Sequence, residues 1–277
     1  MIRCPTCGRR IAAARVCPLH ALAPPAPAPL PDAAAIGVVP RPELAGFRVR
    51  EPLGRGGFGV VFLADRVASG DAVAIKVARA DNAAASEAVL READALSAIG
   101  PPHVPAVYAH GRLPDGAAYV VMELVRAPVL ADRLAELPGP MEIDEVERHA
   151  LALLNAVEAA HEHNLVHCDL KPENVFVDPA FGAKLFDFGL VRTAGARLET
   201  TAEEMAAGTP EYMSPEQCDG RADVDARSDI YALGAIAYEL LAGAPPFWGN
   251  PAEVRQSHRS RRPPGLSRAR RVAPALE

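Results

Sequence analysis

The sequence is organised around residues 167–189, which read HCDLKPENVFVDPAFGAKLFDFG. Phosphoryl transfer needs a group that orients the attacking hydroxyl, oxygen ligands for Mg²⁺, and cations on the phosphates. Asp169 can accept the proton of the hydroxyl, and Lys171 can lie against the transferred phosphate. Asn174 and Asp187 offer the hard oxygen ligands that Mg²⁺ takes. The residue types in this stretch therefore indicate phosphoryl-transfer chemistry.

Taken alone, Asp-Leu-Lys is an ordinary turn and Asp-Phe-Gly is a chance match. In this order and at this spacing, the two motifs resemble the catalytic loop and the metal-binding loop of protein kinases, and residues 171–174 look like the serine/threonine branch. The resemblance covers about residues 47–265 in the family's order. It implies an α+β fold of two lobes, with an antiparallel sheet and one helix in the first lobe and mainly helices in the second. It also implies transfer of the γ-phosphate of ATP, with Mg²⁺ or Mn²⁺, to serine and threonine hydroxyls of protein substrates in signalling.

The composition is that of a globular protein. Of the 277 residues, 49% are hydrophobic and 23% are charged, which suits one large or two small domains. The net charge of -6 does not indicate a nucleic-acid-binding surface. The most apolar stretch, residues 230–247, is broken by Glu239 and two prolines, so no membrane segment is expected. Arginines interrupt the N-terminus, so no signal peptide is expected, and a cytoplasmic location follows.

In a reducing compartment the five cysteines are expected to be metal ligands or thiols rather than disulfides. Cys4 and Cys7 form one short pair, and Cys17 and His20 form a second pair after nine intervening residues. This spacing matches a tetrahedral Zn²⁺ site with three cysteines and one histidine. Residues 1–22 are therefore predicted to be a zinc-ribbon-like unit in which metal binding and folding are coupled, with either a docking or a purely structural role. The alternative is a frayed tail with incidental cysteines.

The remaining chain divides by composition. Residues 23–43 are rich in proline and alanine and predict a semi-extended linker. Residues 44–277 would form the kinase domain, with an N-lobe over residues 44–124 and a C-lobe over residues 125–277.

A glycine-rich segment and a buried lysine mark the N-lobe. Residues 54–59 read GRGGFG between two predicted strands, and glycines let backbone amides approach phosphates closely. Because a strand rather than a helix follows, a dinucleotide-binding turn is not favoured. Lys76 lies in an apolar strand, where its charge is costly unless it is paired or reaches water at an edge. The predicted helix over residues 83–98 offers two partners, and the family pattern selects Glu92 and leaves Glu87 as a surface charge.

The resemblance also implies the roles of the site residues. Catalytic roles fall on Asp169, Lys171, Lys76 and Glu92, and the Mg²⁺ ligands would be Asn174 and Asp187. Met122, which is equally compatible with the core, would flank the adenine pocket before a hinge over residues 123–125. The expected nucleotide contacts are Gly54, Gly56, Gly57, Gly59, Val61, Ala74, Lys76, Met122, Glu123 and Phe176.

The C-lobe begins with a long helical pattern over residues 144–163. His161 and His163 end this helix, where cations suit the helix dipole, and a metal pair there is disfavoured. His167 is predicted to be a structural histidine beneath the catalytic loop. Asp229 begins a segment that resembles the family's buried helix, where it would steady the catalytic loop, cap the helix, or do both.

Two departures from the family pattern matter. Cys168 stands where the family has an arginine that pairs with a phosphorylated activation loop, which weakens the case for switching by loop phosphorylation. Residues 208–216 look like the substrate-binding loop and the Ala-Pro-Glu motif, with Ser214 for alanine. The arginine that usually pairs with Glu216 has no evident candidate, so the C-lobe is expected to lack its final helices.

These departures leave two alternatives to an active kinase. One is a nucleotide-binding pseudokinase scaffold with weak or no activity, and the other is a zinc adaptor with a degenerate domain. The family's catalytic set is nevertheless complete in this sequence, which favours the active enzyme. Its members are Lys76, Glu92, Asp169, Asn174 and Asp187.

Overall fold

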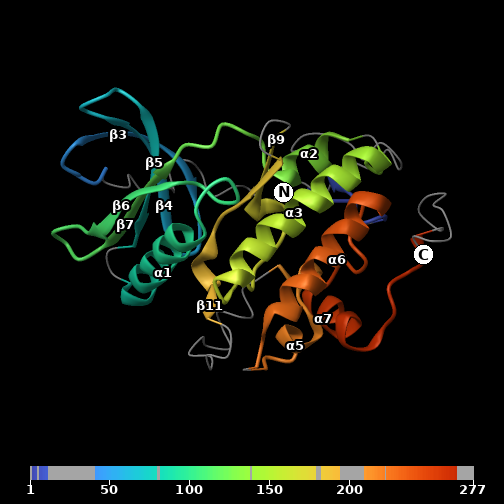
Figure 1. The fold of residues 1–277 in the computed structure, drawn as a ribbon. Helices are drawn as coiled ribbons and strands as arrows, with labels where there is room; N and C mark the ends of the chain where they lie inside the picture. The colour runs from blue at the N-terminus through green and yellow to red at the C-terminus, as the bar shows by residue number, and fades with distance from the viewer. Residues whose placement is uncertain are drawn as a thin grey trace. The chain divides into compact units, whose positions relative to one another are not determined.

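The structure is a computed structural model that describes residues 2–4, 6–11, 41–79, 82–137, 139–178, 182–193, 209–221 and 223–266. The chain divides into two compact units. The sheet unit has the bounds Leu30–Arg126 and Lys184–Val191. The helical unit has the bounds Met1–Pro29, Ala127–Ala183 and Arg192–Glu277. Figure 1 labels the elements of both units.

The sheet unit contains a five-stranded antiparallel sheet in the order β3-β4-β5-β7-β6. Its central strand β5 is buried along most of its length. Of the two edge strands, β6 alternates between half-buried and exposed positions, and β3 is mostly exposed. The two strands predicted on either side of the glycine-rich segment and the predicted strand of Lys76 are confirmed, because β-branched runs separated by turn residues are a strong local signal. The strands are β3 (Phe47–Arg55), β4 (Gly59–Arg66), β5 (Ala72–Ala78), β6 (Val107–Arg112) and β7 (Ala118–Glu123).

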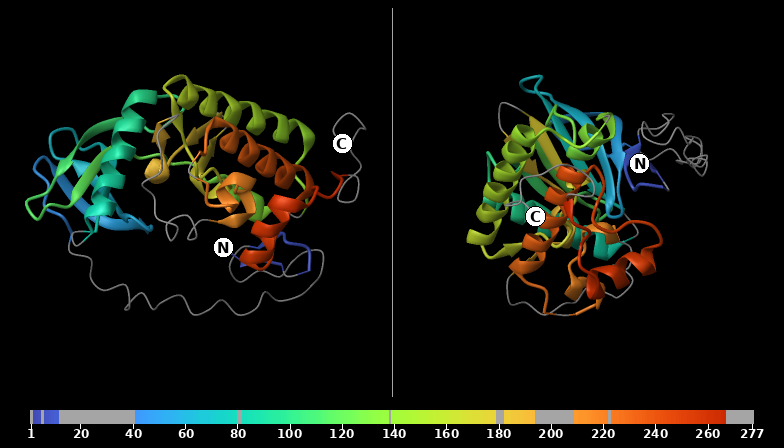
Figure 2. Two further views of the ribbon diagram at one scale, coloured as in Figure 1. Left: turned by 90° about the horizontal axis from the view of Figure 1, so that it is seen from below. Right: turned by 90° about the vertical axis from the view of Figure 1, so that its right-hand side faces the viewer.

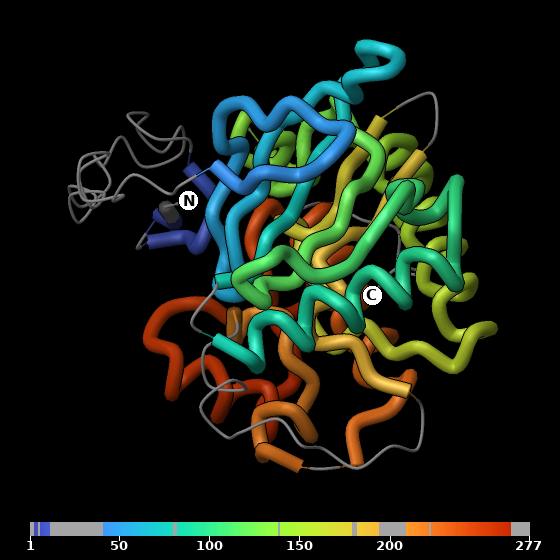
Figure 3. Tube along the Cα trace, turned by 90° about the vertical axis from the view of Figure 1, so that its left-hand side faces the viewer, coloured from blue at the N-terminus to red at the C-terminus, as the bar shows by residue number. Residues whose placement is uncertain are grey.

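One helix, α1 (Ala83–Ile99), packs against strands β5, β6 and β7 of this sheet (Figures 1 and 3). Its buried face carries small and apolar side chains, which let the helix approach the sheet closely. The side chain of Asn82 accepts a hydrogen bond from the Ala85 N–H and caps the first turn. Gly100, with φ of 69°, ends the helix in a backbone conformation that suits glycine. The helix predicted over residues 83–98 is therefore confirmed.

The helical unit is built around α3 and α6, which lie side by side (Figure 2). Fully buried Leu153, Ile236 and Leu240 belong to the core of this unit. The helix predicted over residues 144–163 is confirmed, and Asn164 follows it with φ of 58°. The helices are α2 (Leu130–Glu136), α3 (Ile143–Glu162), α5 (Pro215–Cys218), α6 (Ala226–Ala242) and α7 (Pro251–Ser260).

Short elements connect these helices and carry several of the motifs. Strand β8 pairs with β11, and β9 pairs with β10. The short strands are β8 (Leu165–Val166), β9 (Val175–Asp178), β10 (Gly182–Leu185) and β11 (Arg192–Thr193). The single helical turns are η1 (Pro172–Asn174), η2 (Phe188–Leu190) and η3 (Pro210–Tyr212).

The described N-terminal residues, 2–4 and 6–11, form a small hairpin that we call the N-terminal hook. Strands β1 (Ile2–Arg3) and β2 (Arg10–Ile11) pair antiparallel, with Arg3 opposite Arg10. The turn between them is closed by a hydrogen bond of 2.9 Å from the Gly8 N–H to the Cys4 carbonyl. Strand β2 lies against α2, within the helical unit. The expected zinc ligands Cys17 and His20, and the predicted linker up to residue 40, lie outside the described residues.

The architecture agrees with the fold that the motifs imply. An antiparallel sheet with one helix and a set of mainly helical elements are both present. None of the helices in the described part of the chain combines the length and the apolar character that crossing a membrane requires.

The cap on α1 offers a test of local stability. Asn82→Ala should lower the free energy of unfolding by about 1 kcal/mol, because the first turn of α1 loses a side-chain acceptor. Asn82→Ser should retain most of the stability, since serine caps helices about as well as asparagine. Urea denaturation followed by circular dichroism measures both variants. Equal stability of Asn82→Ala and the wild type would show that the cap contributes nothing.

Candidate functional site

The glycine-rich segment forms the turn between β3 and β4, and the Gly56 N–H donates to the Gly59 carbonyl over 2.9 Å. A side chain on Gly54, Gly56 or Gly57 would meet open space, so the backbone there is accessible to a ligand. Gly59 differs, because a Cβ atom there would lie 2.1 Å from the Val77 carbonyl oxygen. Gly59 is therefore needed for the pairing of β4 with β5, and the other three leave the turn open for phosphates.

Lys76 lies on β5 and is buried. Its Nζ atom is 2.5 Å from Oε2 of Glu92 on α1 and 2.8 Å from Oδ1 of Asp187. Burial opposes the charge, but these two carboxylates outweigh it and raise the pKa of Lys76 above its ordinary value. The lysine is therefore a fixed positive charge. Glu87 instead forms an exposed ion pair with Arg112, as expected for a surface residue.

Asp187 has φ of 62°, a left-handed conformation that aspartate tolerates. The following turn, η2, packs against α1, and the Phe188 side chain is fully buried. The helix that carries Glu92 therefore also anchors the segment that carries Asp187. Within the sheet unit, Lys76, Glu92 and Asp187 form one connected group.

Met122, which directly precedes the expected hinge, is a buried residue of β7 that lies opposite Ala74 of β5. Val61 of β4 lies opposite Lys76 in the same sheet. The Glu123 N–H donates to the Ala106 carbonyl over 2.8 Å, so this donor is already engaged. The Glu123 carboxylate accepts from Lys184 Nζ at 2.6 and 2.7 Å. A nucleotide base would thus have to bond to other backbone groups of the hinge.

In the helical unit, Asp169, Lys171 and Asn174 form a compact network. One oxygen of Asp169, Oδ2, accepts hydrogen bonds from Lys171 Nζ at 2.6 Å and from Asn174 Nδ2 at 3.1 Å. Asn174 Nδ2 also donates to the Asp169 carbonyl over 2.9 Å. Because its nitrogen faces Asp169, the amide oxygen of Asn174 points away from that residue. Phe176 follows on β9 and bridges to Val129.

Asp229 on α6 holds the backbone of this loop. Its carboxylate accepts from the His167 N–H at 2.8 Å and the Cys168 N–H at 3.0 Å, and it contacts His161 Nε2 at 2.8 Å. The helix cap is Asp225, whose side chain accepts from the Arg227 N–H. Of the two roles considered for Asp229, the structure therefore shows support of the catalytic loop. His167, which begins this loop, is buried.

A further support was not foreseen from the sequence. Gln217 Nε2 donates to the Cys168 carbonyl over 2.6 Å. Gln217 also completes a capping box with Ser214 at the start of α5. The spacing Ser-x-x-Gln is the signal that would have predicted the capping box, although it does not reveal the bond to Cys168.

Cys168 adopts φ of 64° and is half-buried. Burial, and then the neighbouring Asp229 carboxylate, raise the pKa of its thiol to about 12, so the side chain is neutral at physiological pH. It cannot supply the charge of the family's arginine. Arg192 on β11 lies opposite Val166, close enough for its charge to act on Cys168. Arg192 therefore stays open as an alternative cation beside the loop.

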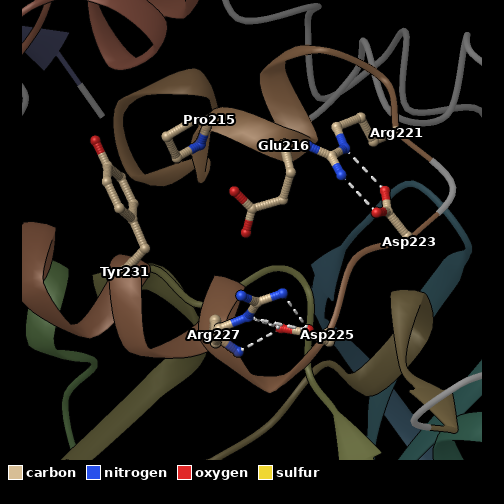
Figure 4. Close-up of a pocket in the computed structure, with 7 residues that line it drawn as sticks. All are labelled: Pro215, Glu216, Arg221, Asp223, Asp225, Arg227 and Tyr231. Carbon is tan, nitrogen blue, oxygen red and sulfur yellow. Dashed lines mark hydrogen bonds and ion pairs between the residues drawn. The ribbon is translucent and has the colours of Figure 1, made fainter.

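The environment of Glu216 is visible in a pocket of the helical unit (Figure 4). Ser228 Oγ donates a hydrogen bond to the Glu216 carboxylate. The two arginines that line the pocket are engaged elsewhere, since Arg221 pairs with Asp223 and Arg227 pairs with Asp225. Among the described residues, Glu216 thus contacts a serine rather than the arginine that is usual in the family.

No cluster of three or more histidine, cysteine or acidic side chains able to hold a metal ion occurs among the described residues. Cys4 is buried and Cys7 packs against it. Cys17 and His20 are outside the described ranges, as are Thr200 and Thr201 of the expected activation loop.

Comparison with known proteins gives a consistent assignment. Residues 47–270 match the model of the protein kinase domain. The chain is 40% identical over 239 residues to serine/threonine-protein kinase pkn2 of Myxococcus xanthus, which covers 83% of this chain and 28% of that protein. It is 37% identical over 233 residues to serine/threonine-protein kinase PknA of Corynebacterium glutamicum, which covers 80% of this chain and 48% of that protein.

Serine/threonine-protein kinase PknF of Mycobacterium tuberculosis is 38% identical over 235 residues, covering 80% of this chain and 48% of that protein. The chain thus spans less than half the length of these curated relatives. The domain model matches most of the chain. The motifs identified in the sequence lie on the elements described above. The chain therefore belongs to the protein kinase family.

Proposed function

We propose that this chain acts as a serine/threonine protein kinase that transfers the γ-phosphate of ATP to hydroxyl groups of protein substrates in signalling. The observation that carries the proposal is the ion pair between Lys76 and Glu92, at 2.5 Å, in a buried strand and helix. A structural protein gains little from a buried charge pair, because desolvation offsets most of the attraction. A fixed cation beside an open glycine turn suits phosphate binding.

The residue roles follow from the two groups of side chains described above, one in the sheet unit and one in the helical unit. The oxygen of a serine or threonine forms a bond to the γ-phosphorus while the bond from that phosphorus to the bridging oxygen of ADP breaks. The hydroxyl proton passes to the Asp169 carboxylate. Lys171 and Asn174 both bind Oδ2 of Asp169 and so orient this carboxylate. Lys76 neutralises phosphate charge, and Glu92 holds the lysine in place.

Asn174 and Asp187 fit a role as Mg²⁺ ligands. The Asn174 amide is held by its nitrogen, which leaves its oxygen directed away from Asp169. Asp187 carries a carboxylate whose orientation is fixed by Lys76. Bound Mg²⁺ would neutralise charge that develops on the phosphates. A pseudokinase scaffold is less well supported, because each residue of the catalytic set is present and Lys76 forms an ion pair with Glu92.

We also propose that Cys4, Cys7, Cys17 and His20 bind one structural Zn²⁺ ion in a reducing, cytoplasmic setting. The support comes from the spacing of the four residues and from the hook, where Gly8 adopts φ of 71° and closes a tight turn after Cys7. The contacts of the hook with the helical unit favour a structural role over docking of a partner.

The kinase activity has a direct test. The wild type should transfer ³²P from [γ-³²P]ATP to dephosphorylated casein, and Asp169→Asn should abolish this transfer because the hydroxyl proton loses its acceptor. Lys76→Met should also abolish it, and Lys76→Met/Glu92→Gln removes the buried charge that the single variant leaves unpaired. Circular dichroism checks that each variant is folded. Turnover in Lys76→Met equal to that of the wild type would remove the assigned role of the lysine.

The zinc site has a test that needs no activity. Metal analysis of the purified full chain should give one zinc ion per chain, and Cys4→Ser/Cys17→Ser should give none, because two of the four ligands are lost. Cys218→Ser provides a control that removes a thiol of the helical unit. The proposal would be defeated if the wild type without metal had an N-terminus as resistant to protease as that of a sample to which zinc had been added.

Activity is expected to be largely independent of phosphorylation of the activation loop. A loop phosphate is ordered by pairing with arginine, and the neutral thiol of Cys168 provides neither its charge nor its bidentate geometry. Thr200→Ala/Thr201→Ala and phosphatase-treated wild type should therefore keep most of the wild-type turnover. A fall of about a hundredfold, near 2.7 kcal/mol of barrier, would show instead that a cation such as Arg192 receives a loop phosphate.

A further inference from the structure

Two arginines of the N-terminal hook reach deep into the helical unit. Arg10 is buried, and its guanidinium group bonds to three side chains that are distant in sequence. Arg10 Nε donates to Glu239 Oε1 over 3.0 Å, and its terminal nitrogens lie 2.6 and 3.3 Å from the two carboxylate oxygens of Glu173. Arg10 Nη2 also donates to the Tyr212 hydroxyl over 2.6 Å. The planar fork of an arginine suits such a junction, and a lysine could not reproduce it.

Glu239 is fully buried near the C-terminal end of α6, within a mainly apolar stretch of that helix. Burial alone would raise the pKa of its carboxyl, but Arg10 and Arg3 outweigh this effect and hold the pKa below its ordinary value. Arg3 Nη1 donates to Glu239 over 2.9 Å. A buried carboxylate without such cations is strongly destabilising, so the helical unit depends on the hook for its charge balance.

Tyr212 completes the cluster. Its hydroxyl donates to Glu239 and accepts from Arg10 and from Arg3 Nη2, the latter over 2.8 Å. One donor and two acceptors are the full hydrogen-bonding capacity of a phenol. Burial and the Glu239 charge raise the pKa of Tyr212 well above its ordinary value, so the hydroxyl keeps its proton. The position of this ring is therefore fixed by the two arginines of the hook.

A steric contact also holds the N-terminal hook in place, and this contact does not depend on charge. Gly8 lies against the Trp248 ring, and a Cβ atom at Gly8 would be 2.4 Å from Cδ2 of that ring. The φ of 71° at Gly8 also disfavours any side chain there. Figure 2 shows the hook in blue beside the C-terminal helices of the same unit.

We propose that Arg10 is a positioning residue for phosphoryl transfer, because it joins the N-terminal hook to Glu173 of the catalytic loop and to Tyr212 of the substrate-binding loop. Glu173 directly precedes Asn174, and Tyr212 lies in the segment that resembles the substrate-binding loop. An intact hook is therefore needed to hold both loops in their active arrangement. This inference rests on the proposed kinase activity.

The test compares variants of the full chain by kcat, by KM for casein and by KM for ATP. Arg10→Ala should lower kcat/KM for casein roughly 10- to 100-fold, the usual size for loss of a residue that orients a site residue. The KM for casein should rise more than the KM for ATP, because Arg10 contacts the substrate-binding loop directly, whereas Lys76, Glu92 and Asp187 are untouched. Arg10→Lys should be intermediate. Gly8→Ala, which removes no charge, should shift the same constants in the same direction.

Arg9→Ala is the matched control. Arg9 belongs to the same hook and is also buried, and its Nη1 atom donates a long hydrogen bond of 3.4 Å to the Leu137 carbonyl. This variant should keep wild-type kinetic constants. If Arg10→Ala folds poorly, Arg10→Ala/Glu239→Gln removes the carboxylate charge that would be left unpaired, and it should still show the raised KM for casein. Mere loss of folded protein would lower kcat and leave both KM values unchanged.

Hydrogen exchange gives a readout that does not require activity. Arg10→Ala should increase amide exchange over residues 209–218 and 168–176, and Arg9→Ala should not. Unchanged exchange in those segments, an unchanged KM for casein, or equal losses in Arg9→Ala and Arg10→Ala would each overturn the inference. If the wild type is inactive but amide exchange increases in Arg10→Ala as expected, the proposed kinase activity is refuted. The contacts of Arg10 with the two loops are then still supported.

Discussion

A lysine ammonium group buried in a β-strand is tolerated only beside a carboxylate, and this constraint organises the sheet unit. Lys76 obtains its partner from α1, so that helix must lie along the sheet in a single rotation about its axis that points Glu92 inward. The cap at Asn82 and the buried apolar face of α1 serve this orientation. Asp187 joins the same cation through the turn η2, which packs on the same helix. A rigid body rotation of α1 would therefore disturb both acidic residues at once.

Much of this arrangement could be predicted from local sequence. The strands and long helices follow from hydrophobic periodicity, and the choice of Glu92 over Glu87 follows from the motif and agrees with the observed ion pairs. The network of Asp169, Lys171 and Asn174 was also predictable as a group, because its members lie within six residues of one another. Their catalytic and metal-binding roles stay predictions.

Contacts between distant segments could not be predicted in the same way. Glu239 interrupts an apolar run, which signals a buried carboxylate in need of a cation, but nothing in the local pattern selects Arg10 from the many arginines of the chain. The same holds for Gln217, whose bond to the Cys168 carbonyl depends on where the loop and α5 meet in space. Asp229 shows a related difficulty, since an aspartate near a helix start has two ordinary roles and only the packed structure distinguishes them.

The ion pair between Arg10 and Glu239 has a consequence for biosynthesis, because the two residues are separated by 229 positions. The hook leaves the ribosome before its carboxylate partner in α6 has been made. At 5–20 residues per second, roughly 10 to 45 s pass between them. During this interval the nascent chain carries two arginines without their final acceptor, and the helical unit can close only after α6 has been made. Pairing over such a separation also slows folding, so completion of this unit is expected to be the late step in maturation of the newly made chain.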